Sequence, residues 1–200
     1  MAEPENIKPA PRRREKKPPK KITEKYLYNS GLAYLQRFPS STPNFRRVMG
    51  RKIDRSCNYH KEQNREDCQK ILDTTVETFV RQGFLNDEAY LQGMVTSLRR
   101  RGLSTQAILS KLVMKGMTQE TILATLRAYD EDRGAVNPDL AAAVMLMRRK
   151  RIGAFRKTSE TDRTKELAAL ARGGFGFDIA QKALSLGQDE AEDILSEMRA

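Results

Sequence analysis

The sequence predicts an all-α protein in which tandem three-helix repeats form an elongated, curved, right-handed or solenoid-like array. Apolar residues recur at helical spacing throughout, and no stretch alternates as a β-strand does. Helix-start and helix-stop residues alternate, most densely from Gly83 to Gly116, where Gly102 ends one helix and Ser104 begins the next. Because this pattern returns on both sides of that stretch, a row of similar helical units is expected rather than one thick core.

The composition suits thin helical cores and a polyanionic partner. Of the 200 residues, 38% are hydrophobic and 32% are charged, and the formal net charge is +11. Such a charge favours nucleic acid, a nucleoprotein, an acidic protein face or an anionic membrane surface as the partner. No apolar run approaches the roughly 20 residues that span a bilayer, and the Pro-rich start has no apolar signal core. Two cysteines give no disulfide framework, so a cytoplasmic location is expected.

Residues 1–22 are predicted to be a disordered basic tail. They contain five prolines and the run Arg12-Arg13-Arg14, and their eight Lys and Arg residues against three Glu give a net charge of +5. Such a segment cannot bury enough apolar surface to offset the entropy of ordering it. It is interpreted either as an arm that attracts polyanions or as a solubilising tail.

The first repeat is predicted over residues 23–86. A cap at Ser41 and Pro43 in the first turn begin its second helix, and a polar connector is expected from Arg55 to Arg65. Gly83 ends the third helix. The three helices are expected at 23–38, from 42 onward, and at about 66–82.

The second repeat is predicted over 87–134 and the third over 135–187, without a linker between them. Asn137-Pro138 supplies a cap and a first-turn proline for the third repeat. A polar break is expected from Gly153 to about Ser159, and residues 188–200 read as an amphipathic C-terminal helix. The methionines of these repeats, Met114 among them, are expected to fill the core.

A comparison by offset indicates which positions are equivalent between repeats. A shift of 63 pairs Ser104 with Ser41, and a shift of 58 pairs Gly116 with Gly174. Leucine-rich helices align by accident, but matching serine and glycine positions are less expected by chance. The sequence therefore predicts that these residues occupy equivalent places in successive units.

Basic residues recur where the first helix of each repeat ends. One basic residue at a helix C-terminus is explained by the helix dipole, worth about 0.3–1 kcal/mol. Runs of three or four are not, because adjacent like charges repel one another. We therefore expect a cationic stripe that binds a polyanion, with further residues from the second helices. The predicted members are Arg37, Arg99, Arg100, Arg101, Lys111, Lys115, Arg148, Arg149, Lys150, Arg151, Lys165 and Arg172.

Other groups of residues give weaker evidence of a functional site. Cys57, His60 and Cys68 supply only three ligands at irregular spacing, whereas structural zinc uses four, so neither a metal nor a cofactor is expected. A Cys–His nucleophile pair has no orienting third group. Phe175 and Phe177 could stack on bases, but packing between helices is favoured.

Several stretches resemble the motifs of the RecX family of regulators. They are GFLNDEAY from Gly83, RGLS from Arg101, ILSKLVMKG from Ile108 and RGGF from Arg172, and the resemblance covers about residues 24–187. The long connector at 55–65, Gly176 and the basic tail depart from the family pattern. The resemblance implies tandem three-helix repeats and a non-enzymatic, monomeric modulator of the RecA recombinase.

The resemblance further implies that the chain binds the groove of the RecA–DNA filament and bridges successive protomers. It implies inhibition of ATP hydrolysis, strand exchange and filament growth, with contact to single- or double-stranded DNA directly or through the filament, and no role for a membrane. The alternative is a stand-alone DNA-binding protein that uses Ser104–Tyr129 as a helix-turn-helix. Gln119 could read a base there, but Glu120 beside it would face phosphates unfavourably.

Overall fold

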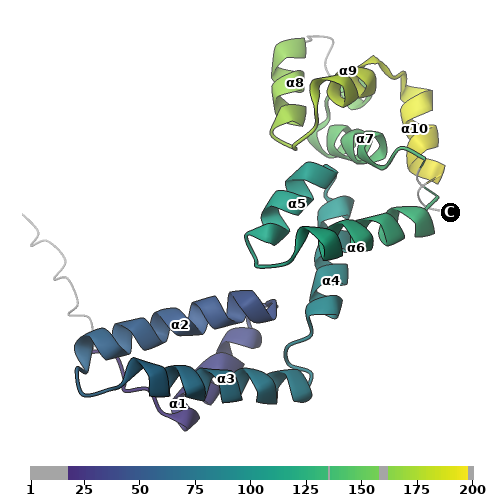
Figure 1. Ribbon diagram of the computed structural model, residues 1–200. Helices are drawn as coiled ribbons and strands as arrows, with labels where there is room; N and C mark the ends of the chain where they lie inside the picture. Colours follow the sequence, from purple (N-terminus) through teal and green to yellow (C-terminus); the bar gives the residue numbers. More distant parts are fainter. Residues whose placement is uncertain (1–17, 135, 158–161, 198–200) are drawn as a thin grey trace, which may run out of the picture.

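The computed structural model describes residues 18–134, 136–157 and 162–197, and over these residues the chain is all-α, as predicted. Ten α-helices and one short 3₁₀ helix, η1, make up the regular structure of the described residues, which contain no strand (Figure 1). Their bounds are α1 Glu24–Leu35, α2 Thr42–Tyr59, α3 Arg65–Arg81, α4 Asp87–Arg100, α5 Thr105–Val113, α6 Gln119–Asp132, α7 Pro138–Lys150, η1 Gly153–Phe155, α8 Arg163–Ala171, α9 Phe177–Ser185 and α10 Gln188–Glu197.

Side-chain caps fix where most of these helices begin. At Ser41, Asn86 and Ser104 a side-chain oxygen accepts a hydrogen bond from the backbone N–H three residues later. These bonds satisfy donors that the first helical turn leaves without a partner. The same holds for Asn137 ahead of Pro138. The helix starts read from Ser41, Ser104 and Asn137 in the sequence are therefore confirmed.

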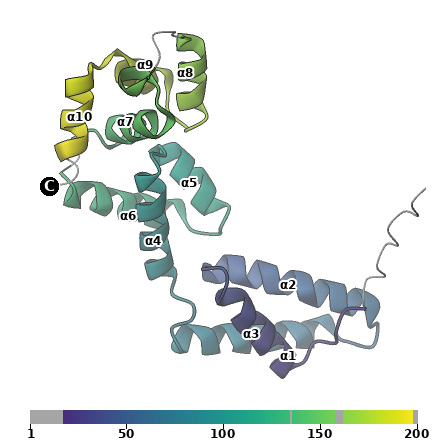
Figure 2. The same ribbon diagram turned by 180° about the vertical axis from the view of Figure 1, so that it is seen from behind.

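The helices form three successive groups, and each group buries its own apolar cluster. We call α1–α3 unit 1, α4–α6 unit 2 and α7–α9 unit 3, with α10 attached to unit 3. Figures 1 and 2 show unit 1 at one end of an elongated molecule, unit 2 in the middle and unit 3 at the other end. The buried clusters fall within 22–85, 91–126 and 140–195. Because each cluster lies within one group, the positions of the units depend on the contacts at their boundaries.

Unit 1 packs around two phenylalanine rings. Phe45 and Phe79 are fully buried, with ring centroids 5.6 Å apart. Gly31 of α1 lies directly over both rings, and a Cβ atom at this position would meet each ring at 2.8 Å. A glycine is therefore needed for α1 to approach α2 and α3 this closely.

The prediction of a polar connector from Arg55 to Arg65 was wrong for its first half. Helix α2 continues to Tyr59 because Ser56 on its inner face is fully buried. Ser56 is covered by residues 18–22, a segment that the sequence assigned to the disordered tail, and its hydroxyl donates to the Lys20 carbonyl. In the structure Ile22 is only 4% exposed and belongs to the unit 1 core. The rest of the predicted tail, residues 1–17, lies outside the described residues.

Unit 3 carries α10 on its outer side. Ala191 and Leu195 of α10 pack with Val144 of α7, so the predicted C-terminal helix is present over Gln188–Glu197. Two predicted core positions elsewhere are exposed. Met114 is 65% and Phe177 is 67% exposed, so the expectation from residue type that both pack inside was wrong.

Candidate functional site

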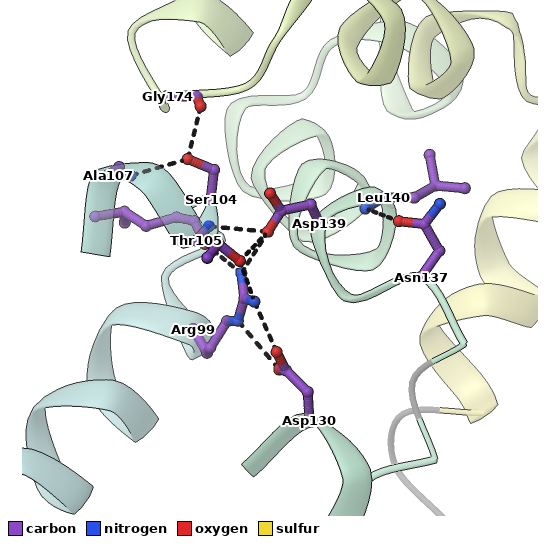
Figure 3. Close-up of polar contacts among 10 residues, drawn as sticks. Arg99, Ser104, Thr105, Ala107, Asp130, Asn137, Asp139, Leu140 and Gly174 are labelled. Atoms are coloured by element: carbon purple, nitrogen blue, oxygen red, sulfur yellow. Dashed lines mark hydrogen bonds and ion pairs between the residues drawn. The ribbon is translucent and has the colours of Figure 1, made fainter. Parts of the chain in front are cut away.

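The boundary between units 2 and 3 is made by hydrogen bonds between helix ends. The hydroxyl of Ser104, the cap of α5, donates to the carbonyl of Gly174 at 2.7 Å and accepts from the backbone N–H of Ala107 at 3.1 Å (Figure 3). The backbone N–H of Ser104 also donates to Gly173 at 3.2 Å. One serine therefore caps its own helix and fixes the α8–α9 turn of the next unit.

The same joint is found between units 1 and 2. The hydroxyl of Ser41, the cap of α2, donates to the carbonyl of Lys115 in the α5–α6 turn at 2.6 Å. In both joints the next backbone N–H donates to an aspartate that lies in the first turn of the following unit. Thr42 donates to Asp87 at 2.6 Å, and Thr105 donates to Asp139 at 2.8 Å.

Both joints also need a glycine where the turns meet. Gly116 and Gly174 have φ of +83° and +86°, values that other residues rarely adopt. A Cβ atom would lie 2.5 Å from Pro43 at the first position and 2.5 Å from the Ser104 hydroxyl at the second. Ser41 and Ser104 therefore occupy equivalent places in the two joints, and so do Gly116 and Gly174, as the comparison by offset predicted.

The second joint has an additional element, a buried arginine. Arg99 of α4 is 2% exposed, and all five of its N–H groups have acceptors (Figure 3). Nε and one Nη2 hydrogen bind the two oxygens of Asp130 at 3.1 and 2.7 Å. Nη1 donates to Leu103 O at 3.1 Å and to Asp139 at 2.8 Å, and Nη2 also donates to the Thr105 hydroxyl at 2.8 Å.

This network joins α4 and α6 of unit 2 to α7 of unit 3. Burial by itself would lower the pKa of Arg99, but the hydrogen bonds that it donates to Asp130 and Asp139 outweigh burial and raise the pKa above its ordinary range. The guanidinium is therefore charged, and two carboxylates hold it in a bidentate and a single contact.

The position of Arg99 corrects the prediction that it belongs to a polyanion-binding stripe. Its side chain is enclosed, so it positions units 2 and 3 instead of meeting a partner. The equivalent position in unit 1 is Gln36, which is exposed. The joint between units 1 and 2 thus has the serine, aspartate and glycine but not the arginine.

The other predicted cations are exposed. They are Arg37, Arg100, Arg101, Lys111, Lys115, Arg148, Arg149, Lys150, Arg151, Lys165 and Arg172. Lys165 pairs with Asp162 at 2.9 Å, and both side chains are largely exposed, so this pair is weak. Arg151 takes a left-handed conformation (φ 56°) that turns the chain from α7 into η1.

The joints bring several of these basic segments together. The α1–α2 turn, which carries Arg37, contacts the α5–α6 turn, which carries Lys115. The α4–α5 turn after Arg100 and Arg101 contacts the α8–α9 turn after Arg172. Exposed basic residues therefore flank both joints, whereas residues 148–150 form the last turn of α7 and Arg151 follows it. Whether all of them form one continuous stripe stays a prediction.

The aspartates of the joints were missed by the sequence reasoning. Asp139 sits in the first turn of a helix, where an acidic residue is expected from the dipole alone. Asp130 lies in the run Asp130-Glu131-Asp132, which reads as a frayed polar helix end. A weak signal was present, because an unbroken run of three arginines suggests that one of them has a buried partner.

The cysteines and the histidine do not form a metal or nucleophilic site. The sulfur atoms of Cys57 and Cys68 lie 3.9 Å apart, and Nε2 of His60 lies 2.8 Å from the carbonyl of Pro19. Burial, followed by the hydrogen bond with Cys57, raises the pKa of the Cys68 thiol to about 11. No group of three His, Cys, Asp or Glu side chains in the described parts of the chain is placed to hold a metal.

The described residues form an all-α array of small units that are joined in the same way at both boundaries, with exposed cations beside the joints. An array of this kind is typical of helical-repeat proteins. None of the described helices is long and apolar enough to cross a bilayer. The comparisons with known proteins then narrow this class to a family.

The chain is 39% identical over 176 residues to the protein named "Regulatory protein RecX" of Myxococcus xanthus (strain DK1622), which covers 84% of this chain and 89% of that protein. It is 37% identical over 115 residues to "Regulatory protein RecX" of Agrobacterium fabrum (strain C58), which covers 56% of this chain and 58% of that protein. No family model matches the sequence, and no solved structure matches it. The chain belongs to the RecX family of regulatory proteins.

Proposed function

We propose that this protein binds the RecA–DNA filament and inhibits its ATPase, strand exchange and growth, without being an enzyme itself. The observation that carries the proposal is family membership, since the identity to the Myxococcus regulator extends over 84% of the chain. The repeated joint adds a physical reason, because it spaces similar units along an elongated molecule.

A helical filament presents the same surface at every protomer. A row of similar units can therefore contact several protomers at once, and weak contacts are strengthened by effective concentration, typically by 10² to 10⁴ overall. Inhibition follows if a bridged groove can no longer change its protomer spacing during ATP turnover. The second joint, with Arg99 enclosed between two carboxylates, keeps units 2 and 3 at a fixed spacing for such a contact.

The exposed basic residues beside the joints and at the end of α7 supply the attraction to a polyanionic filament. Arg100 and Arg101 at the end of α4 and Arg148 and Arg149 at the end of α7 have exposed side chains. Contacts of this kind release counterions, so filament binding should weaken steeply as salt increases.

The test is a titration of the protein into a RecA ATPase assay on single-stranded DNA. The wild-type chain should inhibit, and the double variant Arg100→Ala/Arg101→Ala should need a several-fold higher concentration. Its inhibition should also depend less on salt, by about one unit of the logarithmic slope for each phosphate that the variant no longer neutralises. The matched control is Lys70→Ala/Arg81→Ala, which removes the same charge from exposed positions of α3.

Absence of inhibition by the folded wild-type chain at any concentration would refute the proposal. Equal inhibition by both double variants would remove Arg100 and Arg101 from the binding surface. The helix-turn-helix alternative, in which α6 enters the major groove, is separated by the same proteins. It requires sequence-dependent binding to naked duplex, whereas the filament proposal requires preference for RecA-coated DNA.

A further inference from the structure

We propose that unit 1 contains a binding cleft for single-stranded nucleic acid, remote from the joints. The cleft lies between residues 18–20, α1 and α2 and has a volume of about 690 Å³. Its chemistry is that of cations and aromatic rings, supplied by Lys20, Tyr26, Lys52, Arg55, Asn58 and Tyr59.

The three cations of the cleft are not neutralised. The ammonium groups of Lys20 and Lys52 lie 5.9 and 5.8 Å from the ring centroid of Tyr26, and Nε of Arg55 donates to a backbone carbonyl of its own helix. None of the three forms an ion pair with a described residue, and no Asp or Glu lines the cleft. Positive charge therefore converges on a concave surface, which focuses the field on an anion.

Four other cations of unit 1 form ion pairs, whereas Lys25, Arg51 and Lys61 form none with a described residue. What distinguishes the cleft is that three cations converge on one concave surface whose lining includes no acid. The ion pairs are Lys21–Glu62, Arg46–Asp73, Arg65–Asp54 and Lys70–Asp67.

A tyrosine at the edge of the cleft offers an aromatic surface. Tyr59, the last residue of α2, is 60% exposed, and its ring is T-shaped against the ring of His60, with centroids 4.9 Å apart. An exposed aromatic ring beside unpaired cations is the combination on which bases of single strands stack while their phosphates are neutralised. The amide of the neighbouring Asn58 can donate to and accept from a base edge.

The cleft is formed in advance because its outer wall is fixed. The imidazole of His60 donates from Nε2 to the Pro19 carbonyl at 2.8 Å, and the Ser56 hydroxyl donates to the Lys20 carbonyl at 3.0 Å. Gln63 holds the backbone of Ile22 from both sides at 2.9 Å. A ligand therefore meets a wall whose backbone is already ordered, and less entropy is lost on binding.

Single strands fit this cleft better than duplex or acidic peptide. Bases in a duplex are already stacked and paired, so Tyr59 would contribute nothing to duplex binding. An acidic peptide would use Lys52 and Arg55 but not the tyrosine ring.

The experiment is fluorescence anisotropy with the full chain, a labelled 20-nucleotide single-stranded oligonucleotide and no recombinase. Tyr59→Ala should weaken binding about tenfold, as expected for loss of one stacked base, and Tyr59→Phe should retain it. Lys52→Ala/Arg55→Ala should weaken binding and reduce the logarithmic salt slope by about 1.4, the value for two phosphates of a single strand. Lys61→Ala/Lys70→Ala loses the same charge from exposed positions outside the cleft and should bind nearly as the wild type does.

Two results would overturn the proposal, provided that circular dichroism shows each variant to be folded. One is that Lys52→Ala/Arg55→Ala and Lys61→Ala/Lys70→Ala weaken oligonucleotide binding equally, which would mean that only net charge matters. The other is that Tyr59→Ala binds the oligonucleotide normally while Lys52→Ala/Arg55→Ala loses binding to a labelled poly-glutamate peptide. That result would assign the cleft to an acidic protein segment. Because RecA is absent, neither result bears on the proposed filament regulation.

Discussion

Replacement of Arg99 by Ala tests whether this arginine is structural. The change removes five hydrogen bonds and leaves the carboxylate of Asp130, a residue that is 8% exposed, without its charge partner. Breaking a buried ion pair from one side typically costs about 3–5 kcal/mol. Arg100→Ala, at the exposed neighbouring position, should change the free energy of unfolding by no more than about 0.5 kcal/mol.

Urea unfolding followed by circular dichroism measures the difference. With a slope of about 2 kcal/mol per molar urea, a loss of 3–5 kcal/mol lowers the midpoint by roughly 2 M. The loss should fall on the transition of units 2 and 3 and spare unit 1, whose apolar cluster lies within residues 22–85. Two-state analysis therefore applies to each transition separately.

A double variant sharpens the test. Asp130→Asn removes the charge that Arg99→Ala leaves unpaired, so the two changes together should cost less than the sum of each alone. The expected coupling is about 0.5–3 kcal/mol. If the midpoint of Arg99→Ala equals that of Arg100→Ala, or if the two changes are additive, the buried network does not hold the units together.

Two further predictions concern unit 1. Gly31→Ala should destabilise the protein by about 1–3 kcal/mol because its Cβ would lie 2.8 Å from two buried rings. Gly50→Ala, where nothing lies within 4 Å of the added Cβ, should instead stabilise its helix by about 0.5–1 kcal/mol. Thermal unfolding of both variants measures the difference, and equal effects would contradict the packing argument. Alkylation at pH 8 should modify Cys57 before Cys68, because Cys68 is buried and its pKa of about 11 leaves about one thiol in a thousand ionised. Raising the pH toward 11 should speed the modification of Cys68. Peptide mass spectrometry identifies the modified sites, and equal rates at pH 8 would refute the prediction.

The all-α fold and most helix starts could be read from the sequence because they depend on local chemistry. A serine or asparagine cap acts on N–H groups within three residues, so Ser41, Asn86 and Ser104 announce their helices without tertiary information. Residue type was a less reliable guide to burial. The apolar side chain of Met114 was expected in the core, but Met114 is the C-cap of α5 and is 65% exposed.

Local patterns also could not show which side chains have distant partners. The segment ending at Ile22 looked like part of a disordered tail because the hydrogen-bond partners of its backbone, Ser56 and Gln63, lie 36 and 41 residues away in the chain. The cleft that this segment forms with α2 was invisible for the same reason.

The sequence by itself determined the helices, their caps and the repetition of serine and glycine at equivalent places, because each follows from residues close together in the chain. Only the tertiary structure decided that Ser41 and Ser104 reach across to the next unit, and that Arg99 is enclosed while Arg100 and Arg101 are exposed. Three consecutive arginines are chemically identical. Their different roles depend on the direction in which α4 points each one, and on the two carboxylates, 31 and 40 residues further along, that meet the first.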